Sequence, residues 1–258
     1  MIVIKTSEEI DRMRVACNAA AEILAAVARE VQPGRTTAEL NEVAASLMEK
    51  FGGKSPFLGY KGYPGHICVS VNEEVVHGIP SQRRVQYGDI VSLDVGIIVN
   101  GFVGDNATTV AVGVVEATTQ RLLQVTERAL YAGIAAARPG NRVSDISRAI
   151  QTMVEANGFS VVREFVGHGV GRKMHEEPQI PNYVGSGSDP KLKRGMTLAI
   201  EPMVNAGSPE VLMLSDGWTV VSADGAPSAH FEHTVLVTDG EAEILTWLRK
   251  SPYESKAR

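Results

Sequence analysis

Apolar residues recur at helical spacing in four segments of the chain. This periodicity predicts helices over about 7–30, 37–50, 118–137 and 144–156. The first two helices also carry a marked start, because Thr6 with Glu9 and Thr36 with Glu39 match the capping box. In that motif each side chain accepts the backbone N–H of the other residue, which stabilises the first helical turn. The pattern therefore predicts two pairs of helices.

The same landmarks recur in the second half of the chain. Pro33-Gly34 and Pro139-Gly140 join the helices of each pair and lie 106 residues apart. Two β-rich runs, 88–94 and 195–201, both begin with glycine and end with an acid. We interpret this repeat of turns and β-rich runs as the duplication of one structural unit. The alternative is that common turns recur by chance. The sequence thus predicts one α+β domain over 1–258, built from halves of about 6–115 and 116–247.

Composition narrows the class of protein. The chain is 44% hydrophobic and 21% charged, which is typical of a soluble globular protein. Its 25 basic and 30 acidic residues give a net charge of −5 with no basic block, so we expect no nucleic-acid or membrane partner. Two cysteines exclude a disulfide framework, and no apolar run is long enough to span a membrane. We therefore expect a cytoplasmic protein whose last residues, 251–258, fray.

Two aspartates lie on a predicted β-hairpin. Asn100-Gly101 separates two β-rich runs and is a strong signal for a two-residue hairpin turn. That turn pairs Asp105 with Gly96 and places Asp94 two residues further along the opposite strand. Side chains alternate between the faces of a strand, so both carboxylates lie on one face as diagonal neighbours. Alone, the pair is consistent either with two solvated side chains or with carboxylates that converge on a cation.

Three more metal-binding side chains interrupt apolar strands. His168 is flanked by glycines, and Glu201 ends the second β-rich run. Glu232 lies in an alternating strand that points His230 to the same side and turns His233 away. Such breaks in a hydrophobic pattern are expected at functional sites. Four carboxylates with one imidazole suit Mn²⁺, Fe²⁺, Co²⁺ or Zn²⁺, and a pair of these ions would favour metal-assisted hydrolysis.

These residues belong to longer strings that resemble methionine aminopeptidases of type I, over about residues 4–247. The strings are VNEEVVHGIP at 71–80, Asp94 with GFVGD at 101–105, GHGVG at 167–171, HEEP at 175–178, GMTLAIEPMVNAG at 195–207 and FEH at 231–233. The resemblance implies the α+β pita-bread fold, in which two pseudo-twofold-related α/β halves surround a central antiparallel sheet. It also implies a metal-dependent exopeptidase.

The resemblance implies a role for each candidate ligand. Asp105 and Glu232 are expected to bridge two divalent ions. Asp94 would complete the site of the first ion. His168 and Glu201 would complete the site of the second ion. The identity of the ions stays open among cobalt, manganese, iron and zinc.

The resemblance also implies catalytic and substrate-binding residues. His77 and His175 are expected to contact the substrate peptide and to stabilise charge during the attack, and Glu201 is expected to shuttle the proton. Met174 stands where an aromatic residue is common in the family, and Phe57 where a small residue or cysteine is common. The implied methionine pocket consists of Phe57, Tyr60, Tyr63, Cys68, Met174 and Trp218.

The implied reaction is removal of the initiator methionine from nascent proteins, with small second residues favoured. Two alternatives keep the fold: an X-Pro aminopeptidase or prolidase, whose relatives usually carry an additional N-terminal domain, and a non-catalytic partner-binding protein, whose relatives lose metal ligands. The 31 positions from Glu201 to Glu232 and the start at Met1 favour the short bacterial form over type II. The expected partners are nascent polypeptide N-termini and, transiently, the ribosome, and the protein is expected to be a monomer.

Overall fold

The computed structural model describes residues 1–248, so the fraying expected at residues 251–258 lies outside the described range. The α-helices of this range are α1 (Ser7–Glu30), α2 (Thr37–Lys50), α3 (Ala117–Ala136) and α4 (Val143–Glu155). Each helix lies within one residue of its predicted range. Both predicted capping boxes are formed, because the Glu9 N–H donates to Thr6 Oγ1 and the Glu39 N–H donates to Thr36 Oγ1. The helix starts are therefore determined by local sequence.

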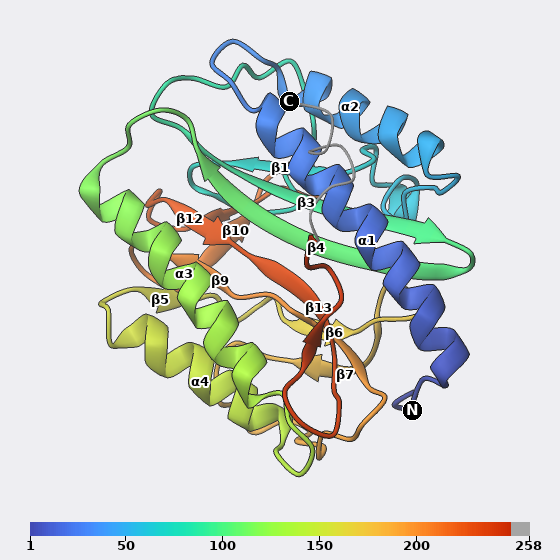
Figure 1. Ribbon diagram of the computed structural model, residues 1–258. Coiled ribbons are helices and arrows are strands. Elements are labelled where there is room, and N and C mark those ends of the chain that lie inside the picture. Colours follow the sequence, from blue (N-terminus) through green and yellow to red (C-terminus); the bar gives the residue numbers. More distant parts are fainter. Residues whose placement is uncertain (249–258) are drawn as a thin grey trace, which may run out of the picture.

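An antiparallel sheet of eight strands forms the centre of the described chain (Figure 1). Its order is β1 (Cys68–Val71), β3 (Ile90–Val99), β4 (Phe102–Ala111), β13 (Glu232–Leu236), β8 (Thr197–Ile200), β6 (Gly167–Gly169) and β7 (Glu176–Ile180), with β14 (Glu243–Ile244) paired to β13. Two smaller sheets accompany it. One has the order β10 (Val211–Met213), β11 (Val220–Ser222), β2 (Glu74–Val76), and the other β12 (Ser228–His230), β9 (Met203–Asn205), β5 (Ser160–Val161).

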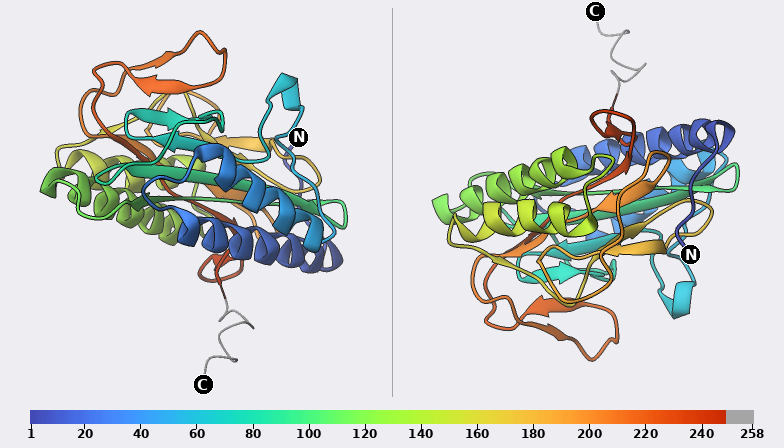
Figure 2. Two further views of the ribbon diagram at one scale, coloured as in Figure 1. Left: turned by 90° about the horizontal axis from the view of Figure 1, so that it is seen from above. Right: turned by 90° about the horizontal axis from the view of Figure 1, so that it is seen from below.

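The helices and the sheets form separate layers. Helix α1, with α2 beside it, packs on β3 and β4, and α3, with α4 beside it, packs on β8 and β13. The short 3-10 turn η1 (Tyr60–Gly62) and the β10–β11 hairpin project away from the helices (Figure 2). None of the helices in residues 1–248 combines the length and the apolar character that a membrane span needs. The apolar core thus fills the space between helices and sheet, which leaves the opposite face of the sheet for a site.

The predicted β-hairpin is formed with the predicted register. Asn100 has a φ of 52° and Gly101 a φ of 78°, and two consecutive positive φ values are what a type I′ turn requires. Gly96 pairs with Asp105 across β3 and β4. Asp94 lies two residues from Gly96 on the same strand, so the two aspartates share one face of the sheet, as the sequence predicted.

Helix α1 approaches β4 very closely beside this aspartate pair. A Cβ atom at Gly104 would lie 2.3 Å from the carbonyl oxygen of Ala16 in α1. A side chain at Gly104 is therefore excluded unless the helix moves. Because Gly104 directly precedes Asp105, the packing of α1 against the sheet also fixes the backbone that carries this carboxylate.

The prediction of one continuous strand through Glu232 is wrong, because the chain changes sheets at Phe231. Residues up to His230 form β12 and pair with β9, whereas residues from Glu232 onward form β13 between β4 and β8. A strand that bends at a corner between two sheets keeps its backbone groups paired on both sides of the bend. His230 nevertheless lies beside the carboxylate cluster and His233 faces away, against Tyr131, as expected.

Candidate active site

The five candidate metal ligands converge from different strands of the large sheet. Asp94 lies on β3, Asp105 on β4 and Glu232 on β13, while His168 lies on β6 and Glu201 directly follows β8. All of them line one cavity of about 270 Å³. The same cavity is lined by all the other catalytic and substrate-binding residues that the resemblance implied: Phe57, Tyr60, Tyr63, Cys68, His77, Met174, His175 and Trp218.

The ligand atoms are close enough to share an ion. One ligand atom each from Asp105, His168 and Glu232 lies within 4.8 Å of the other two. His168 Nε2 is 3.3 Å from Glu201 Oε1 and 3.7 Å from Asp105 Oδ2. Asp105 and Glu232 are almost fully buried, at 1% and 2% exposure. Buried carboxylates that lie this close together repel one another unless protons or cations neutralise them.

The hydrogen bonding of His168 leaves one ring nitrogen free to bind a cation. Nδ1 lies 2.9 Å from the carbonyl oxygen of Gly169, which only accepts, so we assign the ring proton to Nδ1. Burial lowers the pKa of His168 to about 4, so the ring is neutral near pH 7. The lone pair on Nε2 then faces oxygens of Glu201 and Asp105. This arrangement is typical of a metal ligand whose other nitrogen is fixed by a carbonyl.

The carboxylates also fit a divalent cation. Burial raises the pKa of Asp94 to about 7 and that of Glu201 to about 8. The pKa values of Asp105 and Glu232 are also raised well above the ordinary range, first by burial and then by neighbouring carboxylates. Buried oxygens without a hydrogen-bond partner among the described residues are Asp94 Oδ1, Asp105 Oδ1 and Glu232 Oε1. Unpaired carboxylate oxygens around one imidazole suit a divalent metal.

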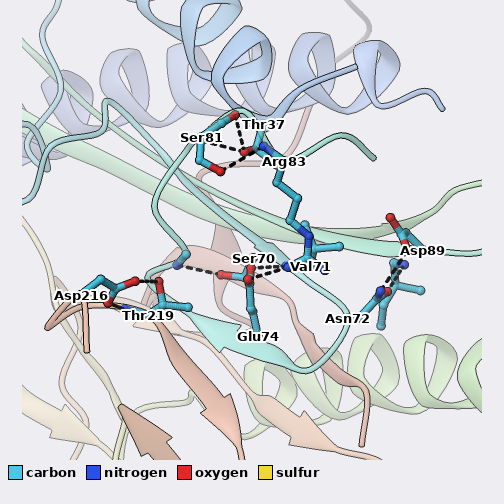
Figure 3. A network of polar contacts seen from close by, with 12 residues as sticks. Thr37, Ser70, Val71, Asn72, Glu74, Ser81, Arg83, Asp89, Asp216 and Thr219 are labelled. Atoms are coloured by element: carbon cyan, nitrogen blue, oxygen red, sulfur yellow. Dashed lines mark hydrogen bonds and ion pairs between the residues drawn. The ribbon is translucent and has the colours of Figure 1, made fainter. Parts of the chain in front are cut away.

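A polar network holds the backbone around His77 (Figure 3). His77 directly follows β2 with a φ of 60°, and the next residue, Gly78, donates its N–H to Ser70 Oγ at 3.0 Å. Glu74 at the start of β2 binds the guanidinium of Arg83 at 2.6 Å. Burial lowers the pKa of His77 to about 4. The imidazole is therefore neutral near pH 7 and offers one N–H to the cavity.

His175 enters the cavity from the loop before β7. Its ring packs edge-on against that of His168, with 4.6 Å between the centroids, and lies 5.7 Å from the ring of Tyr60. Burial, with a contribution from the charge of Lys61, lowers the pKa of His175. The next residue, Glu176, is bound by the ammonium group of Lys5. His175 is therefore a second neutral imidazole beside the cluster.

Trp218 lies in a tight turn held by Asp216, whose bond to Thr219 is drawn in Figure 3. Asp216 Oδ1 accepts the N–H groups of Trp218 and Thr219 at 2.8 Å each, and Asp216 Oδ2 accepts the Thr219 hydroxyl at 2.6 Å. The Trp218 ring packs edge-on against Tyr63, with 5.1 Å between the centroids. Tyr63 is itself held, because its hydroxyl lies 2.9 Å from the carbonyl oxygen of Gly78. These two aromatic rings form a rigid apolar wall.

The remaining pocket residues lie close to the carboxylates. Cys68 pairs with Asp94 across β1 and β3, and burial raises the pKa of its thiol, so it stays protonated. The Phe57 ring lies over Gly96, where a Cβ would approach it to 3.0 Å. Met174 directly precedes His175. The cavity thus combines an acidic floor with aromatic and sulfur-containing walls.

The structure adds cavity residues that the sequence did not indicate. These are Lys61, Val76, Phe165, Val166 and Met203, and His230 lines the cavity with them. Most of them have ordinary apolar side chains, which carry no chemical signal in a sequence. Phe165 packs edge-on against His77 at 5.3 Å. His230 was expected near the cluster from its position relative to Glu232, but no role followed from that position alone.

Known proteins are similar to this chain over nearly its whole length. The profile of metallopeptidase family M24 matches residues 11–239. Methionine aminopeptidase 1 of Bacillus subtilis is 51% identical over 246 residues, which cover 95% of this chain and 99% of that protein. Methionine aminopeptidase of Escherichia coli is 46% identical over 251 residues, covering 96% of this chain and 95% of that one.

Solved structures have the same fold. Methionine aminopeptidase from Thermotoga maritima superposes with a TM-score of 0.94 at 47% identity, covering 96% of this chain and all of that chain. Prolidase from Pyrococcus furiosus gives a TM-score of 0.78 at 24% identity and covers 96% of this chain but 66% of that one, so it shows a shared fold alone. The pita-bread architecture that the sequence strings implied is therefore confirmed.

Proposed function

This chain belongs to metallopeptidase family M24 and is a methionine aminopeptidase, and we propose that it removes the initiator methionine from nascent proteins in the cytoplasm. The observation that carries the proposal is the position of His168 Nε2, which faces carboxylate oxygens of Glu201 and Asp105 within the cavity. A bound cation would relieve the repulsion among these buried carboxylates. The X-Pro peptidases are not favoured, because the relatives with high identity over the whole chain are methionine aminopeptidases.

Five residues would hold two divalent ions. Asp105 and Glu232, on the neighbouring strands β4 and β13, would be shared between both ions. Asp94 would complete the first site, and His168 with Glu201 the second. When bound, the ions would lower the pKa of a water molecule and polarise the scissile carbonyl group. The oxygen-rich donor set suits manganese, iron, cobalt or zinc.

The protein's own residues would handle charge and protons. A carboxylate oxygen of Glu201 would accept the proton of the attacking water and pass it to the nitrogen of the leaving amine. The imidazole N–H groups of His77 and His175 would donate hydrogen bonds to the carbonyl oxygen as it becomes negative. Both rings are held neutral by burial, so each has one proton to donate and keeps its other nitrogen unprotonated.

The walls of the cavity support selectivity for methionine. An unbranched thioether packs well against aromatic rings and sulfur atoms. Tyr63 and Trp218 supply a fixed aromatic wall, and Cys68 and Met174 supply sulfur. We further propose that the narrow cavity favours small second residues, that nascent N-termini are the substrates, and that the protein acts as a monomer in transient contact with the ribosome.

The test is hydrolysis of Met-Gly-Met, Leu-Gly-Met and Met-Pro-Gly by metal-stripped protein, with Mn²⁺, Co²⁺, Fe²⁺ or Zn²⁺ added back. We expect metal-dependent release of methionine from the first and third peptides and little release of leucine. An Asp105→Asn variant in the same assay controls for contaminating peptidases. Cleavage restricted to Met-Pro-Gly would replace the proposal with an X-Pro peptidase. Absence of cleavage with every metal would refute it.

A further inference from the structure

A buried histidine outside the implied ligand set lines the active-site cavity. His230 is the last residue of β12, directly before the chain changes sheets, and its side chain is 3% exposed. Its Nε2 atom has no hydrogen-bond partner among the residues that the structure describes. The same atom lies 3.7 Å from Glu201 Oε2. A buried polar atom without a partner is costly and calls for an explanation.

The backbone of His230 is held firmly, so the ring position is not accidental. The His230 N–H donates to Thr109 Oγ1 at 2.9 Å, and the Thr109 hydroxyl donates to the His230 carbonyl at 2.8 Å. Ser92 Oγ lies 2.8 Å from the same Thr109 oxygen. The residue is thereby tied to β3 and β4, the strands that carry the first two aspartates. Small rotations of the side chain remain possible.

The carboxylate of Glu201 lies between two imidazoles. Its Oε1 faces His168 Nε2 at 3.3 Å, and its Oε2 faces His230 Nε2 at 3.7 Å. The Glu201 backbone is fixed separately, because its carbonyl accepts the side-chain amide of Asn182 at 3.0 Å. The two oxygens therefore have different surroundings: Oε1 is directed at the nitrogen assigned to a metal, and Oε2 at a nitrogen with no other partner.

We propose that His230 is a positioning residue of the metal centre, whose Nε2–H donates to Glu201 Oε2 and so directs Glu201 Oε1 toward the ion shared with His168. A rotation of either side chain that shortens the separation by about half an ångström or more brings it within hydrogen-bond range. Carboxylates that bind metals are regularly oriented by such donors, and loss of an orienting partner typically weakens metal binding 10- to 100-fold. The inference rests on the proposed function for the presence of the metal.

The test measures metal affinity rather than peptide cleavage. Metal-stripped wild type, His230→Leu and His230→Gln are titrated with Mn²⁺ and with Co²⁺ by calorimetry. Leucine fills a similar volume without a donor, whereas the glutamine amide places an N–H group near the position of Nε2. We expect about 10- to 100-fold weaker binding for His230→Leu and recovery of most of that loss in His230→Gln.

A matched control comes from the same segment. His233 points to the opposite side of the sheet, where its Nδ1 lies 2.8 Å from Thr246 Oγ1, so His233→Gln should bind metal as the wild type does. Thermal unfolding of the metal-free proteins verifies that each variant is folded. If His230→Leu does not fold, His230→Met serves as the variant without a donor.

Three outcomes would overturn the proposal. Wild-type affinity in the folded variant without a donor would show that His230 does not orient Glu201. Equal losses in His230→Leu and His230→Gln would show that the imidazole nitrogen itself binds the ion. A loss in His233→Gln as large as that in His230→Leu would show a general effect on the segment. A wild type that binds metal in this manner but cleaves no peptide would refute the proposed function and leave the inference intact.

Discussion

Replacement of Lys5 by methionine tests how a buried ion pair supports the active-site loop. Lys5 Nζ lies 2.5 Å from Glu176 Oε2, and the two side chains are only 3% and 9% exposed. Glu176 Oε1 also accepts the backbone N–H of Lys173 at 3.2 Å. The pair thus ties the segment before α1 to the loop that carries His175. Lys5→Met keeps the aliphatic volume but leaves the Glu176 carboxylate buried and unpaired.

Removal of one partner from a buried ion pair costs about 3–5 kcal/mol, because the other charge loses its compensation. For a chain of 258 residues, each kcal/mol lowers the melting temperature by about 2–4 °C. The expected fall is therefore roughly 6–20 °C. Because Glu176 adjoins His175, the freed carboxylate should also displace the imidazole, so we expect kcat to fall more than KM rises.

The assays are thermal and urea unfolding of metal-free protein together with steady-state kinetics on Met-Gly-Met. Arg172→Met is the matched control. Arg172 lies in the same loop as His175, and its Nη2 is 3.2 Å from Glu9 Oε1, but its side chain is 59% exposed. Exposed pairs contribute about 0–1 kcal/mol. The double variant Lys5→Met/Glu176→Met should regain much of the lost stability, because no unpaired charge remains. A loss for Lys5→Met no larger than for Arg172→Met would refute the reasoning.

Three further predictions follow from the cluster and its support. Asp105→Asn should reduce metal-dependent hydrolysis by more than about a hundredfold, the upper end of the effect of orienting partners alone. Without metal the variant lacks a buried acid whose ionisation is opposed by its neighbours, so it should melt no lower than the wild type, and a lower melting temperature would contradict this. Gly104→Ala should lower the free energy of unfolding in urea by about 1–3 kcal/mol, because the added methyl group would overlap the backbone of α1. Gly187→Ala is the control and should leave that free energy unchanged, because Gly187 has open space around it. In metal-free protein, burial raises the pKa of Asp94 to about 7 and that of Glu201 to about 8, so the folded state retains protons that the unfolded chain has released, and the free energy of unfolding should fall as the pH rises from about 7.5 to 8.5. Over that interval the buried histidines are neutral in the folded state and nearly all neutral in the unfolded chain, so a melting temperature that rises with pH there would contradict the assignment.

Local signals in the sequence predicted the helices and the hairpin well. The capping residues Thr6 and Thr36 act within one helical turn, so neither helix start depends on the rest of the fold. The turn at Asn100-Gly101 fixes the β3–β4 register in the same local manner. With that register known, the shared face of Asp94 and Asp105 follows from the alternation of side chains along a strand.

Features that depend on contacts between distant segments could not be predicted in this way. The alternation around Glu232 is compatible with one long strand, and only the position of β9 shows that the chain changes sheets at Phe231. For the same reason the sequence predicted only that His230 lies on the side of Glu232, and not that it approaches Glu201. The Lys5–Glu176 pair joins residues 171 positions apart, and neither residue has a neighbour in sequence that marks it as buried.

The cluster lies where strands from the first and second halves of the sequence pair in one sheet, and this arrangement makes the site dependent on both. Asp105 comes from β4 and Glu232 from β13, and these strands pair directly, with Glu232 opposite Ala107. Side chains alternate with a period of two, so a slip of one residue between β4 and β13 would turn Glu232 out of the cavity. Such a slip is opposed by the bond from the Thr234 hydroxyl to the Asp105 carbonyl at 2.8 Å. The pairing of these two strands therefore determines whether the residues assigned to bridge the metals can meet, before any metal is bound.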